Sequence, residues 1–126
     1  MNILLADDNL SSRELMREIL ETSGHLILEA VNGRDALDLI QEKEPELVFL
    51  DLQMPVLDGF SVIRELRNDA RFRRLPVIAV TASAMLGDRE RAIAAGFDSY
   101  IAKPINLGDV RKQVELFSSR EPHTRK

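Results

Sequence analysis

The 126-residue chain contains no cysteine and no long hydrophobic run. Without cysteine, it can use neither a disulfide framework nor a thiolate metal site. No apolar stretch approaches the roughly 20 residues that a membrane-spanning helix requires. The apolar run Ile3–Ala6 is too short for the core of a secretion signal, and Asp7 and Asp8 follow it at once. We therefore expect a cytoplasmic protein without membrane contact.

The chain also lacks a clustered excess of positive charge. It has 21 acidic and 17 basic residues, which give a formal net charge of −4. Because nucleic-acid-binding modules carry clustered positive charge, we expect no direct binding to nucleic acid. Neither GxxxxGK[ST] nor GxGxxG occurs, which excludes nucleotide hydrolysis and dinucleotide binding by those routes. His25 and His123 lack the spacing of a catalytic triad or a metal site.

What the chain does contain is a series of short apolar runs within the length of one ordinary domain. Five runs have strand length and are rich in branched residues: Ile3–Ala6, Leu26–Ala30, Leu47–Leu50, Val77–Val80 and Ser99–Ala102. Three of them, ILLA, LVFL and VIAV, show no alternation of apolar and polar residues. That pattern is typical of parallel strands covered on both faces, so we expect helices on both sides of a sheet.

The segments between these runs have the apolar spacing of amphipathic helices. Five helices are expected to begin at or beside Asn9, Asn32, Asp58, Ser83 and Asn106. The fourth is expected over Ser83–Ala95, with Gly87 weakening its first turns. The fifth is expected to end by Ser118, and the polar residues 119–126 predict a frayed tail. Repeated alternation of strand and helix predicts one α/β domain over residues 1–118.

The polar residues at the strand ends are the strongest functional signal, because open parallel sheets bind ligands beyond the carboxyl ends of their strands. Four of the five expected strands end in polar residues: Asp7 and Asp8, Asp51, Thr81, and Lys103. Two carboxylates about 4 Å apart repel by roughly 4 kcal/mol at an effective dielectric near 20. Such a cluster must take up a proton or bind a cation.

An oxygen-rich site without histidine or cysteine suits a hard cation such as Mg²⁺, which binds carboxylates, water and substrate phosphate. The sequence therefore predicts a metal-bound phosphate as substrate. Lys103 would add a positive charge beside it, and the Thr81 hydroxyl would donate to a phosphate oxygen. A carboxylate can itself be the nucleophile, which would give an aspartyl phosphate.

The motifs LLADDN, FLDLQMP, VTA and YIAKPI, taken together, resemble those of the receiver domains of two-component response regulators. The resemblance covers Asn2 to about Ser118. It implies a doubly wound, flavodoxin-like sheet of five parallel strands in the order 2-1-3-4-5. It also implies that Asp51 accepts a phosphoryl group from a phosphohistidine on a sensor histidine kinase or phosphotransfer protein. The implied Mg²⁺ ligands are Asp7, Asp8, Asp51 and the backbone carbonyl of Gln53.

The same resemblance assigns the remaining roles. Thr81 is the switch hydroxyl, Lys103 contacts the phosphate, and the backbone N–H of Ala82 approaches it. Tyr100 is the aromatic residue whose rotamer follows phosphorylation, and the bond between Lys103 and Pro104 is expected to be cis. Gln53 and Ser83 occupy positions that tune the lifetime of the phosphoryl group. Because Ser83 carries no charge to activate water, we predict slower phosphoryl loss than in a relative with an acid there.

Phosphate binding would change the face formed by the fourth helix, the fifth strand and the fifth helix. This face is the expected contact for a downstream protein or for a phosphorylation-dependent homodimer, and its candidate residues are Met85, Leu86, Arg91, Tyr100 and Arg111. The cluster of Arg71, Arg73 and Arg74 is interpreted as a solvated loop, with partner contact as the alternative.

Other functions remain as alternatives. A haloacid dehalogenase-like phosphatase would need a second Asp where Gln53 stands, and a flavodoxin-like FMN carrier would meet repulsion from Asp7 and Asp8. The intact set of site residues disfavours a pseudo-receiver scaffold. The expected catalysis is limited to self-catalysed phosphotransfer and autodephosphorylation. The chain could also be excised from a hybrid kinase or larger regulator. Met1, just before the first strand, favours a genuine N-terminus, and a complete chain would signal through its own surface.

Overall fold

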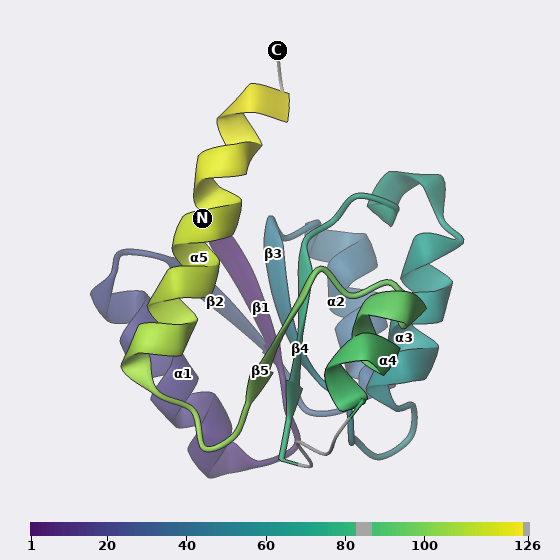
Figure 1. Ribbon diagram of the computed structural model, residues 1–126, viewed down its shortest axis with the longest axis horizontal. Helices are drawn as coiled ribbons and strands as arrows, with labels where there is room; N and C mark the ends of the chain where they lie inside the picture. Colours follow the sequence, from purple (N-terminus) through teal and green to yellow (C-terminus); the bar gives the residue numbers. More distant parts are fainter. Residues whose placement is uncertain (83–86, 125–126) are drawn as a thin grey trace.

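The computed structural model describes residues 1–82 and 87–124, with side chains described through Ser118. A five-stranded parallel sheet lies between two layers of helices (Figure 1). The strands are β1 (Asn2–Ala6), β2 (Leu26–Ala30), β3 (Leu47–Asp51), β4 (Val77–Thr81) and β5 (Ser99–Ala102). Their order is β2-β1-β3-β4-β5, which confirms the doubly wound, flavodoxin-like topology.

Helices α1 and α5 cover one face of the sheet, and α2, α3 and α4 cover the other (Figure 1). The helices are α1 (Leu10–Thr22), α2 (Gly33–Lys43), α3 (Gly59–Arg67), α4 (Asp88–Ala95) and α5 (Leu107–Thr124), with a short 3₁₀ turn η1 (Ala70–Phe72) before β4. Within residues 1–82 and 87–124, no helix is long and apolar enough to cross a membrane.

The predicted capping residues begin four of the helices. Each side-chain oxygen accepts a hydrogen bond from the backbone N–H three residues later: Asn9 from Ser12 at 2.9 Å, and Asn32 from Asp35, Asp58 from Ser61 and Asn106 from Asp109 at 2.8 Å. These bonds satisfy N–H groups that the first helical turn leaves without partners. They fix where each chain segment leaves the sheet edge that carries the site.

The core lies on both faces of the sheet because consecutive strand residues point to opposite sides. Leu4 and Leu50 pack with residues of α2, α3 and α4, whereas Ile3, Leu5 and Phe49 pack with residues of α1 and α5. All five residues of β3 and all five of β4 are buried, as the non-alternating runs predicted. Buried central strands give the residues at their ends a rigid support.

Two helix boundaries differ from the sequence expectation. Gly87 lies outside α4 in a left-handed conformation with φ +91°, so the described helix begins at Asp88 rather than including Gly87. Ser83, Met85 and Leu86 lie outside the described residues. At the other end of the chain, α5 continues past Ser118 to Thr124, although the sequence has no apolar period there.

Candidate functional site

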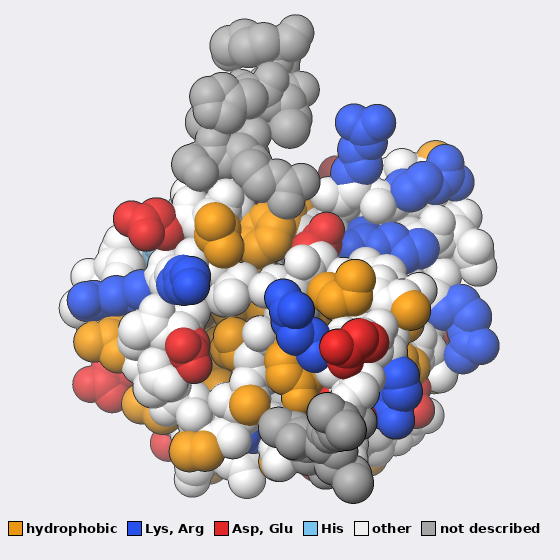
Figure 2. Space-filling view, viewed as in Figure 1, with side chains coloured by type: hydrophobic (Ala, Val, Ile, Leu, Met, Phe, Trp, Pro, Cys, Tyr) orange, Lys and Arg blue, Asp and Glu red, His pale blue; other side chains and the backbone are white. Residues whose placement is uncertain are grey.

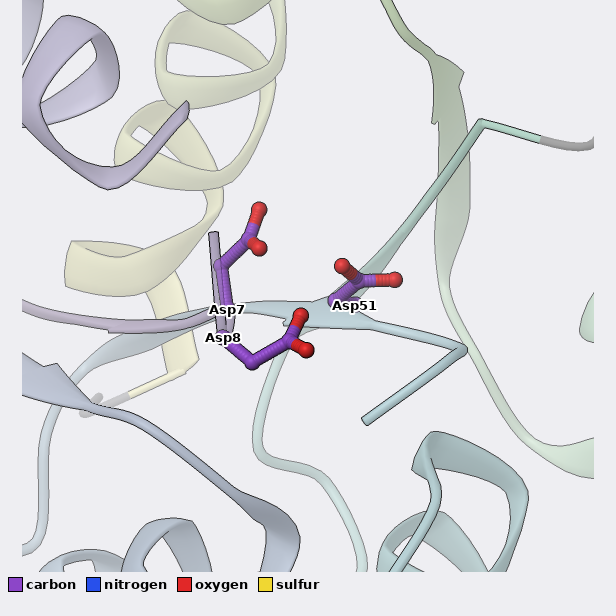
Figure 3. Close-up of side chains that lie close together, drawn as sticks. All are labelled: Asp7, Asp8 and Asp51. Atoms are coloured by element: carbon purple, nitrogen blue, oxygen red, sulfur yellow. The ribbon is translucent and has the colours of Figure 1, made fainter. Parts of the chain in front are cut away.

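Three carboxylates meet at the adjoining ends of β1 and β3. Asp7 and Asp8 follow β1, Asp51 ends β3, and the two strands are hydrogen-bonded neighbours. One oxygen from each carboxylate can be chosen so that all three lie within 4.8 Å of one another (Figure 3). The side chains of Asp7 and Asp51 are only 5% exposed, whereas Asp8 is exposed. The acidic cluster is therefore buried at its base and open to solvent at Asp8.

Lys103, just after β5, places one cation against this cluster. Its Nζ lies 3.0 Å from Oδ2 of Asp7 and 3.1 Å from Oδ2 of Asp51. Burial by itself would lower the pKa of Lys103, but its contacts with Asp7 and Asp51 together outweigh burial and raise that pKa above its ordinary value. Lys103 is therefore a cation at neutral pH and links two of the three carboxylates.

Asp51 is held in an environment that disfavours its charged form. Burial is the main cause, and it raises the pKa of Asp51 to about 6. The backbone N–H of Gln53, which donates to Oδ1 at 2.9 Å, and the ammonium of Lys103 oppose this rise, while the charge of Asp7 adds to it. Asp51 is therefore an anion at neutral pH, but its charge is incompletely compensated.

The donor set fits a hard divalent cation. Oδ2 of Asp7 is buried and accepts no well-aligned hydrogen bond among the described residues, so its close contact is the ion pair with Lys103. Three carboxylates face a single ammonium, which leaves excess negative charge. All the side-chain ligand atoms are oxygens, the type that Mg²⁺ prefers. A cation at this position would give the buried oxygen of Asp7 a second positive partner besides Lys103.

Thr81 and Ala82 extend the site along the sheet edge. Thr81 is the buried last residue of β4, and its carbonyl accepts a hydrogen bond from the backbone N–H of Lys103 at 2.8 Å. Val80, the preceding residue, pairs with Asp51 in β3, and the following Ala82 is exposed. A cleft of about 300 Å³ opens beside Thr81 and is lined by Leu52, Gln53, Asp58, Phe60, Thr81, Asp88 and Arg91. The cleft is large enough for a small group beside Thr81 and Gln53.

Tyr100 lies in β5, on the face of the sheet covered by α2, α3 and α4, where it is half-buried. Burial raises the pKa of its phenol, and the charge of Asp88 adds to that rise. The peptide bond between Lys103 and Pro104 is cis, as the family resemblance implied. Of the expected partner surface, Arg91 and Arg111 are exposed, and Met85 and Leu86 lie outside the described residues.

Some residues that shape the site have no clear sequence signal. Arg13 of α1 donates from Nη1 to the backbone carbonyl of Asp7 at 2.8 Å, and its Nε donates to Glu29 at 2.9 Å. A contact between a helix side chain and a carbonyl outside the helix leaves no periodic pattern. Gly59 lies so close to β3 that a Cβ there would be 2.6 Å from the carbonyl oxygen of Asp51. A glycine at a first helical position, directly after its cap, is the one hint that the sequence offers.

Comparisons with known proteins agree with this geometry. The sequence profile of the response regulator receiver domain matches residues 3–115. The polar-differentiation response regulator DivK of Brucella anthropi is 41% identical over 106 residues, which cover 84% of this chain and 86% of that protein. The match therefore extends over nearly all of both chains.

Solved structures show the same likeness. The receiver domain of the Francisella response regulator 1452 superposes with a TM-score of 0.87 at 27% identity, covering 94% of this chain and 97% of that one. The receiver domain of the sensor histidine kinase PA1611 from Pseudomonas aeruginosa, which has a magnesium ion coordinated in its active-site cleft, has a TM-score of 0.84 at 32% identity, covering 93% and 97%. The chain belongs to the family of response regulator receiver domains, which act in two-component signalling.

Proposed function

We propose that this receiver domain is a phosphorylation-dependent switch in which Asp51 accepts a phosphoryl group from a phosphohistidine. The observation that carries the proposal is the setting of Asp51, a buried carboxylate at the end of β3 that lies 3.1 Å from the ammonium of Lys103 and beside two further carboxylates. Its pKa of about 6 leaves it ionised at neutral pH. An ionised carboxylate with incompletely compensated charge is a competent nucleophile.

In the proposed step, a carboxylate oxygen of Asp51 attacks the phosphorus atom. The new P–O bond forms as the P–N bond to the donor imidazole breaks, and the imidazole nitrogen keeps the electron pair. Lys103 then neutralises part of the charge on the phosphoryl oxygens. The hydroxyl of Thr81 and the backbone N–H of Ala82 are proposed to donate to the same oxygens. The donor is a sensor histidine kinase or a phosphotransfer protein.

The carboxylates of Asp7, Asp8 and Asp51, together with the backbone carbonyl of Gln53, are proposed to hold Mg²⁺. When bound, the ion would neutralise charge on the transferring phosphoryl group. Support comes from the three clustered carboxylates, whose charge a single ammonium does not balance, and from the magnesium ion in the receiver domain of PA1611. The domain has no separate substrate in this proposal, since its chemistry is its own phosphorylation and dephosphorylation. Gln53 and Ser83 would tune how long the phosphoryl group survives.

The output is proposed to pass through Thr81 and Tyr100. As Thr81 moves toward the phosphoryl group, Tyr100 would turn inward and change the face formed by α4, β5 and α5. Arg91 and Arg111 are exposed, but the guanidinium of Arg91 lies 5.8 Å from the centroid of the Phe60 ring in α3, and Arg111 lines a hollow between α1 and α5. The proposed contact with a downstream protein or a second phosphorylated copy therefore rests on the change at Tyr100 rather than on these two arginines. A cytoplasmic location and the absence of direct nucleic-acid contact belong to the same proposal.

The test is phosphorylation by acetyl phosphate in the presence of MgCl₂, followed by measurement of the intact mass. Wild-type protein should gain about 80 Da, and EDTA or the Asp51→Asn substitution should abolish the gain. Asp58→Asn is the matched control, because it makes the same change in charge on a residue that lines the cleft beside Thr81, and asparagine can still cap α3. An unphosphorylated wild type would leave the domain as a scaffold without acceptor chemistry. Equal loss in the Asp58→Asn control would mean that the loss does not identify Asp51 as the acceptor.

A further inference from the structure

Charge is divided unevenly along the chain. Residues 1–58 contain 13 acidic and 4 basic residues, whereas residues 59–97 contain 4 acidic residues and 7 arginines. In the fold, basic side chains gather over α3, η1 and α4, on the right of Figure 2. A protein with a net charge of −4 therefore carries a basic region away from its acidic half. Such local fields steer oppositely charged partners even when the total charge has the other sign.

Several of these arginines have no ion-pair partner. Within the part of the chain that the structure describes, Arg64, Arg73 and Arg74 are exposed and form no ion pair. The nearest polar contact of Arg64 is the hydroxyl of Ser61 at 3.4 Å, and Nε of Arg73 donates to the carbonyl of Arg67 at 3.4 Å. Their guanidinium groups are therefore free to bind external carboxylates, which they can do through two parallel hydrogen bonds.

A hollow of about 350 Å³ lies beside these arginines, between α3 and α4, and is lined by Phe60, Arg64, Arg67, Asn68 and Ala95. Phe60 is half-buried and packs edge-to-face on Phe97, with the ring centroids 6.1 Å apart. Arg67 is fixed because its Nε donates to the carbonyl of Gly96 and its Nη2 donates to Asp98, both at 2.9 Å. The hollow thus has an aromatic surface and one rigid cationic wall.

This combination points to one kind of ligand. The hollow has room for one apolar side chain of a ligand. The arginines around it would bind carboxylates on the ligand residues before and after that apolar residue. A long polyanion such as nucleic acid would also meet the acidic residues of the first half of the chain, which repel it. Arg64 lines this hollow, and Arg73 contacts the backbone of Arg67, another of its lining residues. We propose that the hollow between α3 and α4 binds an acidic segment of a partner protein through an aromatic or branched apolar anchor, with Arg64 and Arg73 as the cationic contacts.

The proposed site lies on the side of α4 that packs against α3, not on the face that α4 forms with β5 and α5. Its contacts involve none of the carboxylates at Asp7, Asp8 and Asp51. Binding should therefore occur in the unphosphorylated protein, so that a failure of this proposal is distinguishable from a failure of phosphorylation at Asp51.

The probe is a short fluorescein-labelled peptide of Asp, Glu and Gly with one central Phe. Its binding to the protein is measured by fluorescence polarisation at low salt. The double variant Arg64→Glu/Arg73→Glu should weaken binding about tenfold or more. The matched control Arg111→Glu/Lys112→Glu makes the same change in net charge on exposed positions of α5 and should change binding less than about threefold. Replacing the central Phe of the peptide by Ala should weaken binding to the wild-type protein about fivefold. This test requires no substitution in the protein.

Three results would overturn the proposal. The first is equal weakening in the two double variants, which would show that net charge alone drives binding. The second is an affinity that does not depend on the central Phe of the peptide. The third is tighter binding of a single-stranded oligonucleotide of similar length at the same arginines, which would identify the face as a nucleic-acid site.

Discussion

Replacement of Asp51 by Asn should stabilise the fold in the absence of a divalent cation. In the folded protein, burial of the carboxyl group is the main cause that raises the pKa of Asp51 to about 6 from the ordinary 3.8, and the negative charge of Asp7 adds to the rise. Asparagine has nearly the same shape, and its oxygen can still accept the hydrogen bond from the backbone N–H of Gln53. The substitution therefore removes a charge that the fold disfavours while keeping the local packing.

The change in the free energy of unfolding follows from the pKa values of Asp51 in the folded and unfolded states. Because the folded pKa lies above the unfolded one, the folded state binds more protons between pH 3.8 and about 6, so stability falls as pH rises through this window. A difference of about two pKa units is worth about 3 kcal/mol above pH 7. The pKa of about 6 already includes the attraction by Lys103. Because the site is open to solvent at Asp8, solvent screening reduces this free-energy difference. We expect a net gain of about 1–2 kcal/mol at pH 8, falling by about half at pH 5.

The assay is urea unfolding followed by far-ultraviolet circular dichroism, with EDTA present, since the chain has no tryptophan for fluorescence. Asp38→Asn is the control, because it makes the same change in net charge on a side chain that is 64% exposed. It should alter the free energy of unfolding by less than about 0.5 kcal/mol. The reasoning is refuted if Asp51→Asn gives no gain at pH 8, or if its gain is equally large at pH 5.

Three further substitutions test other features of the structure. Val56 is 78% exposed and has φ +71°, a costly conformation for a β-branched residue, so Val56→Asn should raise the free energy of unfolding by about 1 kcal/mol in urea titrations; a decrease would contradict this. Arg13→Met should weaken Mg²⁺ binding about tenfold in calorimetric titrations, whereas Arg17→Met should not, and equal effects would count against a positioning role for Arg13. Gly59→Ala should destabilise the fold by about 2 kcal/mol in thermal unfolding, while Gly108→Ala, which meets only ordinary contacts, should not.

Much of the fold could be predicted from local pattern. The apolar runs located all five strands to within one residue at each end. For β1, β3 and β4 the signal is clear because strands buried on both faces have no polar positions to interrupt the run. Capping residues located helix starts because their side chains bond to the adjacent turn. The pairing order of the strands came from the family resemblance, since apolar runs do not say which strands are neighbours. The start of α4 was wrong because nothing in the apolar pattern shows that Gly87 takes a left-handed conformation.

The site was predictable to the extent that it depends on strand ends. Parallel strands end at one edge of a sheet, so the sequence positions of Asp7, Asp51 and Lys103 placed them along the same edge. Their contact also depends on the strand order, which came from the family resemblance. The contact of Arg13 with the carbonyl of Asp7 was not predictable, because it depends on how α1 lies across the end of β1. The hollow beside Phe60 likewise depends on the spacing between α3 and α4.

The central claim is that Asp51 is the residue that becomes phosphorylated. An aspartyl phosphate is an acyl phosphate, which borohydride reduces to the alcohol, so the modified aspartate is converted to homoserine. Protein treated with acetyl phosphate and MgCl₂ should, after reduction and proteolysis, contain homoserine at position 51, and the Asp51→Asn variant should contain none. Homoserine at Asp7 or Asp8, or at no position in the wild type, would contradict the account.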